Sequence, residues 1–169
     1  WQLASQETVA ADLAEVGPNQ FFAALLKFAE LPAEEVARLV PGADVSGQLT
    51  VDVQAVRECL QIRSIPSTEI RRRLRDLCGR GTHKYTGGQI HRSKEGRDIL
   101  DLSAQIAYES RTEILTPLHL LQALLICPTT EIRQVLISGP LPGSSGSAVR
   151  TPLLEEYGKD MRKAAAGGE

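Results

Sequence analysis

Three side chains able to bind a metal or act as nucleophiles lie close together in the chain: Cys78, His83 and His91. Thiolate sulfur and imidazole nitrogen are the ligands that zinc prefers, so a zinc site is the first chemistry to consider. Their spacing matches no common zinc-binding pattern, however, and no fourth ligand stands at a fitting distance. We therefore predict no metal in this stretch.

His119 is the second candidate, because an imidazole can act as a general base near neutral pH. It stands in a run of apolar residues, and no Ser, Cys or carboxylate occurs at a fixed spacing that would make a catalytic pair. A buried histidine usually satisfies its ring nitrogens with nearby hydrogen bonds. We predict a core histidine bonded to a backbone group and no catalytic residue.

Four arginines, Arg71–Arg73 and Arg75, form the most basic cluster in the chain. On a helix whose inward face carries Ile70, Leu74 and Leu77, they fall on the opposite face. The whole chain carries a formal net charge of −2, which gives no electrostatic reason to expect nucleic acid or an anionic membrane. The cluster is predicted to be a solvated face or a protein contact.

Other signals of chemistry are missing from the sequence. It has no Gly-x-x-x-x-Gly-Lys-Ser/Thr loop, so we expect no nucleotide or other cofactor on these residues. The cysteines Cys59, Cys78 and Cys127 are odd in number and widely spaced, which predicts small buried residues in a reducing compartment. With no secretory signal or membrane-length apolar run visible, we expect a cytoplasmic protein.

The strongest helix signal is Thr116–Leu125. Thr116 is a good N-cap, and Pro117 fits the first helical position, where its missing N–H costs nothing. The residues from Leu118 to Ile126 are apolar nearly all the way round, which indicates a helix buried on most sides. This helix is expected at the centre of the core.

The same pattern occurs 99 positions earlier, from Gly17 to Leu26. Pro18 corresponds to Pro117, Gln20 to His119, and the pair Leu25-Leu26 to Leu124-Leu125. An internal repeat of this kind outweighs local propensity in predicting a fold. The chain is therefore predicted to be all-α, with a unit of helix, turn, buried helix and helix used twice.

The spacing of apolar residues and the residues that start or stop helices predict the individual elements. We expect helices over 1–15 and 18–29 and helices beginning near 32, 50, 66, 93, 117 and 130, with a polar loop over 79–89. Residues 138–151 are rich in Gly, Ser and Pro, as in a flexible linker, and 152–169 are too short to be a domain. We expect that a further domain follows.

The second copy, with its Thr-x-x-His start and its Ala-Leu-Leu end, resembles the paired repeats of the N-terminal domain of Clp/Hsp100 AAA+ unfoldases and disaggregases. Thr151–Met161 resembles the opening of the first ATPase module of those machines. The resemblance implies two pseudo-symmetric multi-helix repeats in one orthogonal domain of about eight helices, followed by a flexible tail. Copy one then spans about 1–78, copy two 90–137, the linker 138–151 and the start of the ATPase module 152–169, with an insertion around 42–66.

The resemblance also implies a function. The domain would bind unfolded or tagged polypeptide, or an adaptor protein, for the ATPase ring of the same chain, which would be a homo-hexamer using ATP and Mg²⁺. Thr116, Pro117, His119, Leu124 and Leu125, with Pro18, Leu25 and Leu26, are the structural motif in this comparison. An alternative is a stand-alone interaction domain that docks on a Clp ring without binding substrate.

One branch of the family places an acidic residue before the motif histidine to bind phosphorylated arginine. This chain has Leu118 and Asn19 at the two corresponding positions. The comparison therefore favours an apolar peptide groove, expected between the two copies.

Overall fold

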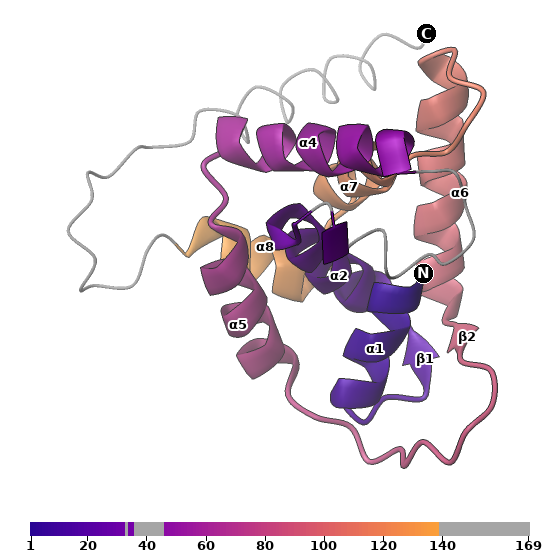
Figure 1. The fold of residues 1–169 in the computed structure, drawn as a ribbon. Helices are drawn as coiled ribbons and strands as arrows, with labels where there is room; N and C mark the ends of the chain where they lie inside the picture. The colour runs from indigo at the N-terminus through magenta and orange to yellow at the C-terminus, as the bar shows by residue number, and fades with distance from the viewer. Residues whose placement is uncertain (33, 36–45, 139–169) are drawn as a thin grey trace, which may run out of the picture. The chain divides into compact units, whose positions relative to one another are not determined.

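The computed structural model describes residues 1–32, 34–35 and 46–138, and in this part the chain is mostly helical. This confirms the predicted all-α class. Figure 1 shows how the elements are arranged. They are α1 (Gln2–Ala10), β1 (Glu15–Val16), α2 (Pro18–Glu30), α4 (Ser46–Ile62), α5 (Ser67–Cys78), β2 (His91–Arg92), α6 (Lys94–Glu109), α7 (Pro117–Ile126) and α8 (Thr130–Ile137).

The helix α2 lies at the centre of the core and packs against α1, α4, α5 and α7 (Figure 1). Its side chains Phe22 and Leu26 are fully buried, and so are Leu121 and Leu124 of α7. Each such side chain contributes about 1.5–3 kcal/mol to folding by leaving water. The helices α2 and α7, which share the capping-and-proline pattern, are thus the most enclosed by their neighbours, as the sequence predicts. The exception is Ile126 at the end of α7, which is exposed.

Helix starts follow the local sequence. Ser93 caps α6, where its hydroxyl oxygen accepts a hydrogen bond from the Gly96 amide at 3.0 Å. Thr129 caps α8 in the same way, accepting from the Ile132 amide at 3.1 Å. Both side chains satisfy backbone N–H groups that lack a partner inside the helix.

The two-residue strands β1 and β2 form a parallel pair in which Glu15 stands opposite His91 and Val16 opposite Arg92. The α6 helix then lies close against β1. A Cβ on Gly96 would come within 2.5 Å of the Val16 carbonyl oxygen, so only glycine fits at this position. No sequence pattern predicts these strands, because two residues are too few to show an alternation of apolar and polar side chains.

Several predicted boundaries are wrong. The first helix ends at Ala10 instead of residue 15, since Asp12 turns into the left-handed region with φ of 54°. The α4 helix begins at Ser46, four residues before the predicted cap at Thr50. Leu77, predicted to face inward on α5, is 40% exposed.

Three predictions fall on parts of the chain that the structure leaves undescribed. The helix from Pro32 lies mostly within 33 and 36–45, and the linker beyond Ser138 and the segment 152–169 lie within 139–169. Among the residues that are described, no single helix is long and apolar enough to cross a membrane, and α7 with α8 reaches that length only as a pair bent by 87°.

Candidate functional site

His119 occupies the third position of α7 and is buried. Its Nδ1 accepts a hydrogen bond from the backbone N–H of Thr116 at 3.2 Å, so a neutral ring carries its proton on Nε2. The Thr116 hydroxyl lies 3.1 Å from the same nitrogen. Thr116 is the N-cap residue of α7, as predicted. The predicted hydrogen bond between a core histidine and the backbone is confirmed.

The start of α2 has the same arrangement without a histidine. Gln20, also at the third helical position, accepts a hydrogen bond from the Gly17 backbone N–H through Oε1 at 3.1 Å. In both helices the side chain of the residue three positions after the N-cap accepts a hydrogen bond from the backbone N–H of the N-cap residue. In both, a proline directly follows the N-cap. The difference between Gln20 and His119 therefore changes the residue type but leaves the capping role unchanged.

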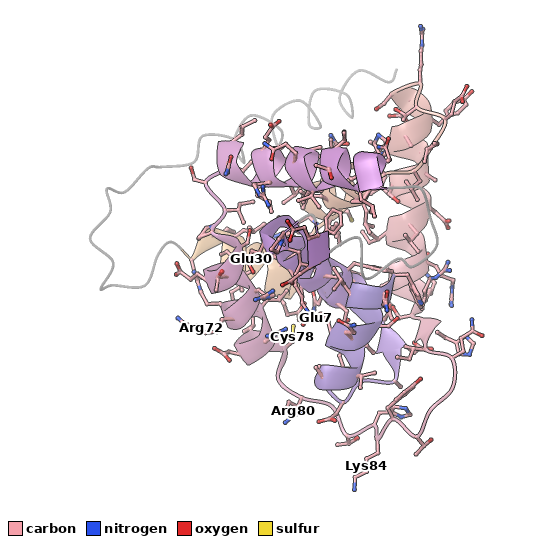
Figure 2. The ribbon with its side chains drawn as sticks, in the orientation of Figure 1. Glu7, Glu30, Arg72, Cys78, Arg80 and Lys84 are labelled. Carbon is pink, nitrogen blue, oxygen red and sulfur yellow. The ribbon has the colours of Figure 1, made fainter. Side chains whose placement is uncertain are left out.

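A hollow of about 310 Å³ opens between α1, the start of α2 and the end of α5. Its polar wall contains Glu7, Asn19, Arg75, Cys78 and Arg80, and its apolar wall contains alanines of α1 and α2 with Leu74. Figure 2 labels Glu7, Cys78 and Arg80 around this part of the molecule. Both signs of charge are present, so the electrostatics of this hollow favour neither a cation nor an anion.

Glu7 is already satisfied inside this hollow. Its side chain is 5% exposed, while that of Arg75 is 51% exposed. The Arg75 guanidinium donates hydrogen bonds to both carboxylate oxygens of Glu7, from Nε to Oε2 at 2.9 Å and from Nη2 to Oε1 at 2.7 Å. This pair joins α1 to α5 and leaves the carboxylate no free position for a reaction.

Cys78 and Asn19 belong to a polar network that links α2, α5 and α8. The Asn19 side-chain amide donates to the Cys78 sulfur and to Glu131 Oε2, both at 3.3 Å, and its Oδ1 accepts from the Thr129 hydroxyl at 2.6 Å. Desolvation, followed by the nearby Glu131 charge, raises the pKa of the Cys78 thiol, whereas the Asn19 bond opposes this shift. The thiol therefore stays protonated at neutral pH and is a poor nucleophile.

The cysteines do not all follow the prediction. Cys59 is buried, and its pKa is raised by desolvation, with Arg63 acting against this. Cys78 and Cys127 lie at the ends of α5 and α7 and are exposed residues, although Asn19 partly covers the Cys78 sulfur. The prediction failed because helix ends reach the surface even when the helix itself is in the core.

The zinc candidates take part in other structure. His91 lies in β2, His83 is held in the loop by its backbone, and Cys78 contacts Asn19. Throughout residues 1–32, 34–35 and 46–138, the structure has no group of three or more His, Cys, Asp or Glu side chains placed to hold a metal.

The arginine cluster on α5 is not simply a solvated face, because most of it is engaged within the fold. Arg71 pairs with Glu30 at 3.3 Å, Arg73 with Glu69 at 3.8 Å, and Arg75 with Glu7. Arg72 is exposed and, within the described part of the chain, makes no ion pair (Figure 2). The cluster thus serves mainly to join α5 to α1 and α2.

The predicted apolar groove between two copies does not coincide with either hollow described. The first hollow is lined by residues of the first predicted copy together with Gly79 and Arg80 of the loop that follows it. The second hollow, of about 510 Å³, lies between the end of α2, α4 and α5 and is lined by residues of the first predicted copy alone. Three exposed apolar side chains, Tyr108, Ile114 and Leu115, lie close together in the sequence at the end of α6 and in the loop before α7. We call these three residues the α6–α7 apolar patch.

Comparison with known proteins adds no relative. No family model, no curated protein and no solved structure matches this chain. A functional assignment therefore depends on the residues and the geometry described above.

Proposed function

We propose that residues 1–137 are the N-terminal domain of a Clp/Hsp100-type AAA+ machine and bind unfolded or tagged polypeptide, or an adaptor, for its ring. The observation that carries this proposal is the paired capping geometry of α2 and α7. Two helices 99 residues apart begin with a proline at the first position and a side chain at the third position that accepts from the N-cap amide. Both lie in the core and contact each other.

This pairing supports a double repeat. The α1 helix packs on α2, as α6 packs on α7. The α2 and α7 helices meet in the middle, so the two pairs share one core instead of forming separate domains. In the Clp/Hsp100 comparison, such a domain is a binding module whose chemistry lies elsewhere in the chain.

The described residues also favour binding over catalysis. His119 and Gln20 are caps, Glu7 is held by Arg75, and the Cys78 thiol has a raised pKa. The α6–α7 apolar patch is the candidate for contact with an unfolded chain, because its three side chains are exposed, apolar and close in sequence, and contiguous apolar surface marks interaction sites.

In this proposal the remaining parts act as the resemblance implies. Residues 138–151 tether the domain, and 152–169 begin an ATPase module that uses ATP and Mg²⁺ in a homo-hexameric ring. A flexible tether would raise the local concentration of captured polypeptide near the ring without fixing one geometry.

Binding can be tested by titrating the isotope-labelled chain with casein, an unfolded protein, and following backbone amide resonances. We expect shifts at Tyr108, Ile114 and Leu115 that grow with casein concentration. The variant Ile114→Ser should weaken binding, whereas Ile62→Ser should not. Ile62 is a matched control because it is 77% exposed, against 70% for Ile114, and lies at the end of α4.

The result that would refute substrate capture is an unchanged spectrum at every casein concentration. If Ile62→Ser weakens casein binding as much as Ile114→Ser does, the α6–α7 apolar patch is not the binding site. A chain that ignores casein but binds an isolated Clp ring would favour the stand-alone interaction domain.

A further inference from the structure

The segment between α5 and α6 is the most basic stretch of the chain after the arginine cluster. From Leu77 to Lys94 it contains Arg80, Lys84, Arg92 and Lys94 but no Asp or Glu. These eighteen residues thus carry a formal charge of +4, and the rest of the chain carries −6. We call residues 79–92 the basic loop.

Both ends of the basic loop are fastened to the segment between α1 and α2. The Gly81 amide donates to the Ala11 carbonyl oxygen at 2.8 Å, and the His83 amide donates to that of Asp12 at 2.9 Å. A Cβ on Gly81 would lie 2.3 Å from the Asp12 oxygen, so glycine is needed for this approach. The other end is held by β2, which pairs with β1.

The middle of the basic loop projects from these two anchors. Lys84 to Gln89 are all exposed, and within the described residues these six make no backbone–backbone hydrogen bond. Gly87 and Gly88 turn the chain with φ of 95° and 112°, and the Tyr85 hydroxyl donates to the Gly88 carbonyl oxygen. Relative to the described part of the chain, the loop therefore presents several unpaired backbone N–H groups beside its charges.

The four basic side chains differ in whether they already interact with another group of the chain. Arg80 pairs with Asp12 at 3.1 Å, and Lys94 pairs with Asp98 at 2.8 Å. The Arg92 guanidinium lies 5.1 Å from the centre of the Trp1 ring. Lys84 makes no ion pair within the described residues, and Figure 2 shows its ammonium group pointing away from the helices.

We infer that the basic loop is a docking site for an acidic, extended segment of a partner polypeptide. Carboxylates accept hydrogen bonds from backbone N–H groups and from ammonium groups, and the loop offers both together. The inference rests on the proposed function and deepens it, because it names the chemical class of one bound segment.

The charge distribution favours a peptide over a nucleic acid. A nucleic acid extends its phosphates well beyond the loop, toward residues whose net charge is −6, and binding it tightly needs many cationic contacts. Tyr85 is also the single Phe, Tyr or Trp of the basic loop, which gives little surface for stacking bases. A short acidic segment can confine its charge to the loop.

The experiment measures fluorescence anisotropy of a labelled peptide of alternating Glu and Gly on the full chain. The controls are the same peptide with Gln in place of Glu, and a single-stranded oligothymidylate. The test variant is Lys84→Glu, and the matched control is Arg72→Glu, which makes the same charge change at an exposed cation on α5 that has no ion pair among the described residues (Figure 2).

We expect the Glu peptide to bind more tightly than the Gln peptide and to weaken as salt is added. Lys84→Glu should raise its Kd about five- to tenfold, because the reversal removes one exposed ion pair and adds a repulsion of similar size. Arg72→Glu should change the Kd by less than about twofold, because Arg72 lies within α5, outside the basic loop, and salt screens interactions between exposed charges.

Three results would overturn the inference: equal affinity for the Glu and Gln peptides, equal effects of the two variants, or tighter binding of the oligothymidylate. If casein still binds while the Glu peptide does not, this inference fails and the proposed function stands. If neither binds, both fail.

Discussion

Removing the guanidinium of Arg75 tests whether the Glu7–Arg75 pair joins α1 to α5. In Arg75→Ala the Glu7 carboxylate, 5% exposed, loses the counter-charge that contacts both of its oxygens. Breaking a buried pair costs about 3–5 kcal/mol, because a buried charge is left uncompensated. Arg75 is half-exposed, so water can enter the vacated space, and we expect a loss of about 2–4 kcal/mol.

The reverse change should cost less. In Glu7→Gln the remaining Arg75 can turn its guanidinium toward water, so we expect a loss of about 1–2 kcal/mol. The asymmetry follows from the geometry: the carboxylate is the enclosed partner, and the guanidinium is the accessible one. The double variant Glu7→Gln/Arg75→Ala should therefore lose less than the sum of the two single changes.

The measurement is urea denaturation at neutral pH, followed by far-ultraviolet circular dichroism. Arg72→Ala is the matched control on the same helix and should stay within about 0.5 kcal/mol of the original chain, as exposed surface changes do. The reasoning is refuted if Arg75→Ala is no more destabilising than Arg72→Ala, or if the two single changes add without coupling.

Three further predictions concern helix starts and close approaches. His119→Ala should lower the free energy of unfolding by at least about 1 kcal/mol, because the Thr116 amide loses its acceptor. His119→Gln should restore part of this lost stability, because Gln20 fills the same capping role in α2. Thermal denaturation of the two variants measures the difference. Gly96→Ala should cost about 1–3 kcal/mol by forcing a Cβ against a backbone oxygen. Gly47→Ala, whose Cβ would meet no atom of the described residues within 4 Å, should be neutral or stabilising in urea denaturation, and equal effects of the two changes would contradict the close approach at Gly96. The backbone amide of Glu131 itself, and then Asn19, hold the pKa of the Glu131 carboxyl below its ordinary 4.5, so its contribution is present above that pH and lost as pH falls through the lowered value. Glu131→Gln should accordingly cost about 0.3–1 kcal/mol at neutral pH and progressively less as the pH falls through the lowered pKa, and a loss independent of pH would argue against this charge effect.

Much of the secondary structure could be predicted because its signals are local. Proline at the first helical position, Ser93 and Thr129 as caps, and the apolar run of α7 each act within a few residues. These signals located α2, α6, α7 and α8 to within a residue or two. The first helix was predicted too long because nothing in its periodicity marks the left-handed turn at Asp12.

The interactions between distant residues could not be predicted in this way. Glu7 and Arg75 are 68 positions apart, and Asn19 and Glu131 are 112 apart. The rotation of α5 about its own axis relative to α1 decides which arginine of the cluster contacts the buried carboxylate. No local sequence pattern specifies that rotation. For the same reason the exposed ends of α5 and α7 left Cys78 and Cys127 accessible.

The sequence by itself determined the helical class, the central place of α2 and α7, and the likeness of their starts, since capping and apolar runs are short-range physics. Only the tertiary structure decided that Arg75 pairs with Glu7, and that the basic loop is fastened at both ends with Lys84 exposed between them. These features depend on atoms brought together from distant parts of the chain, where packing sets the distances.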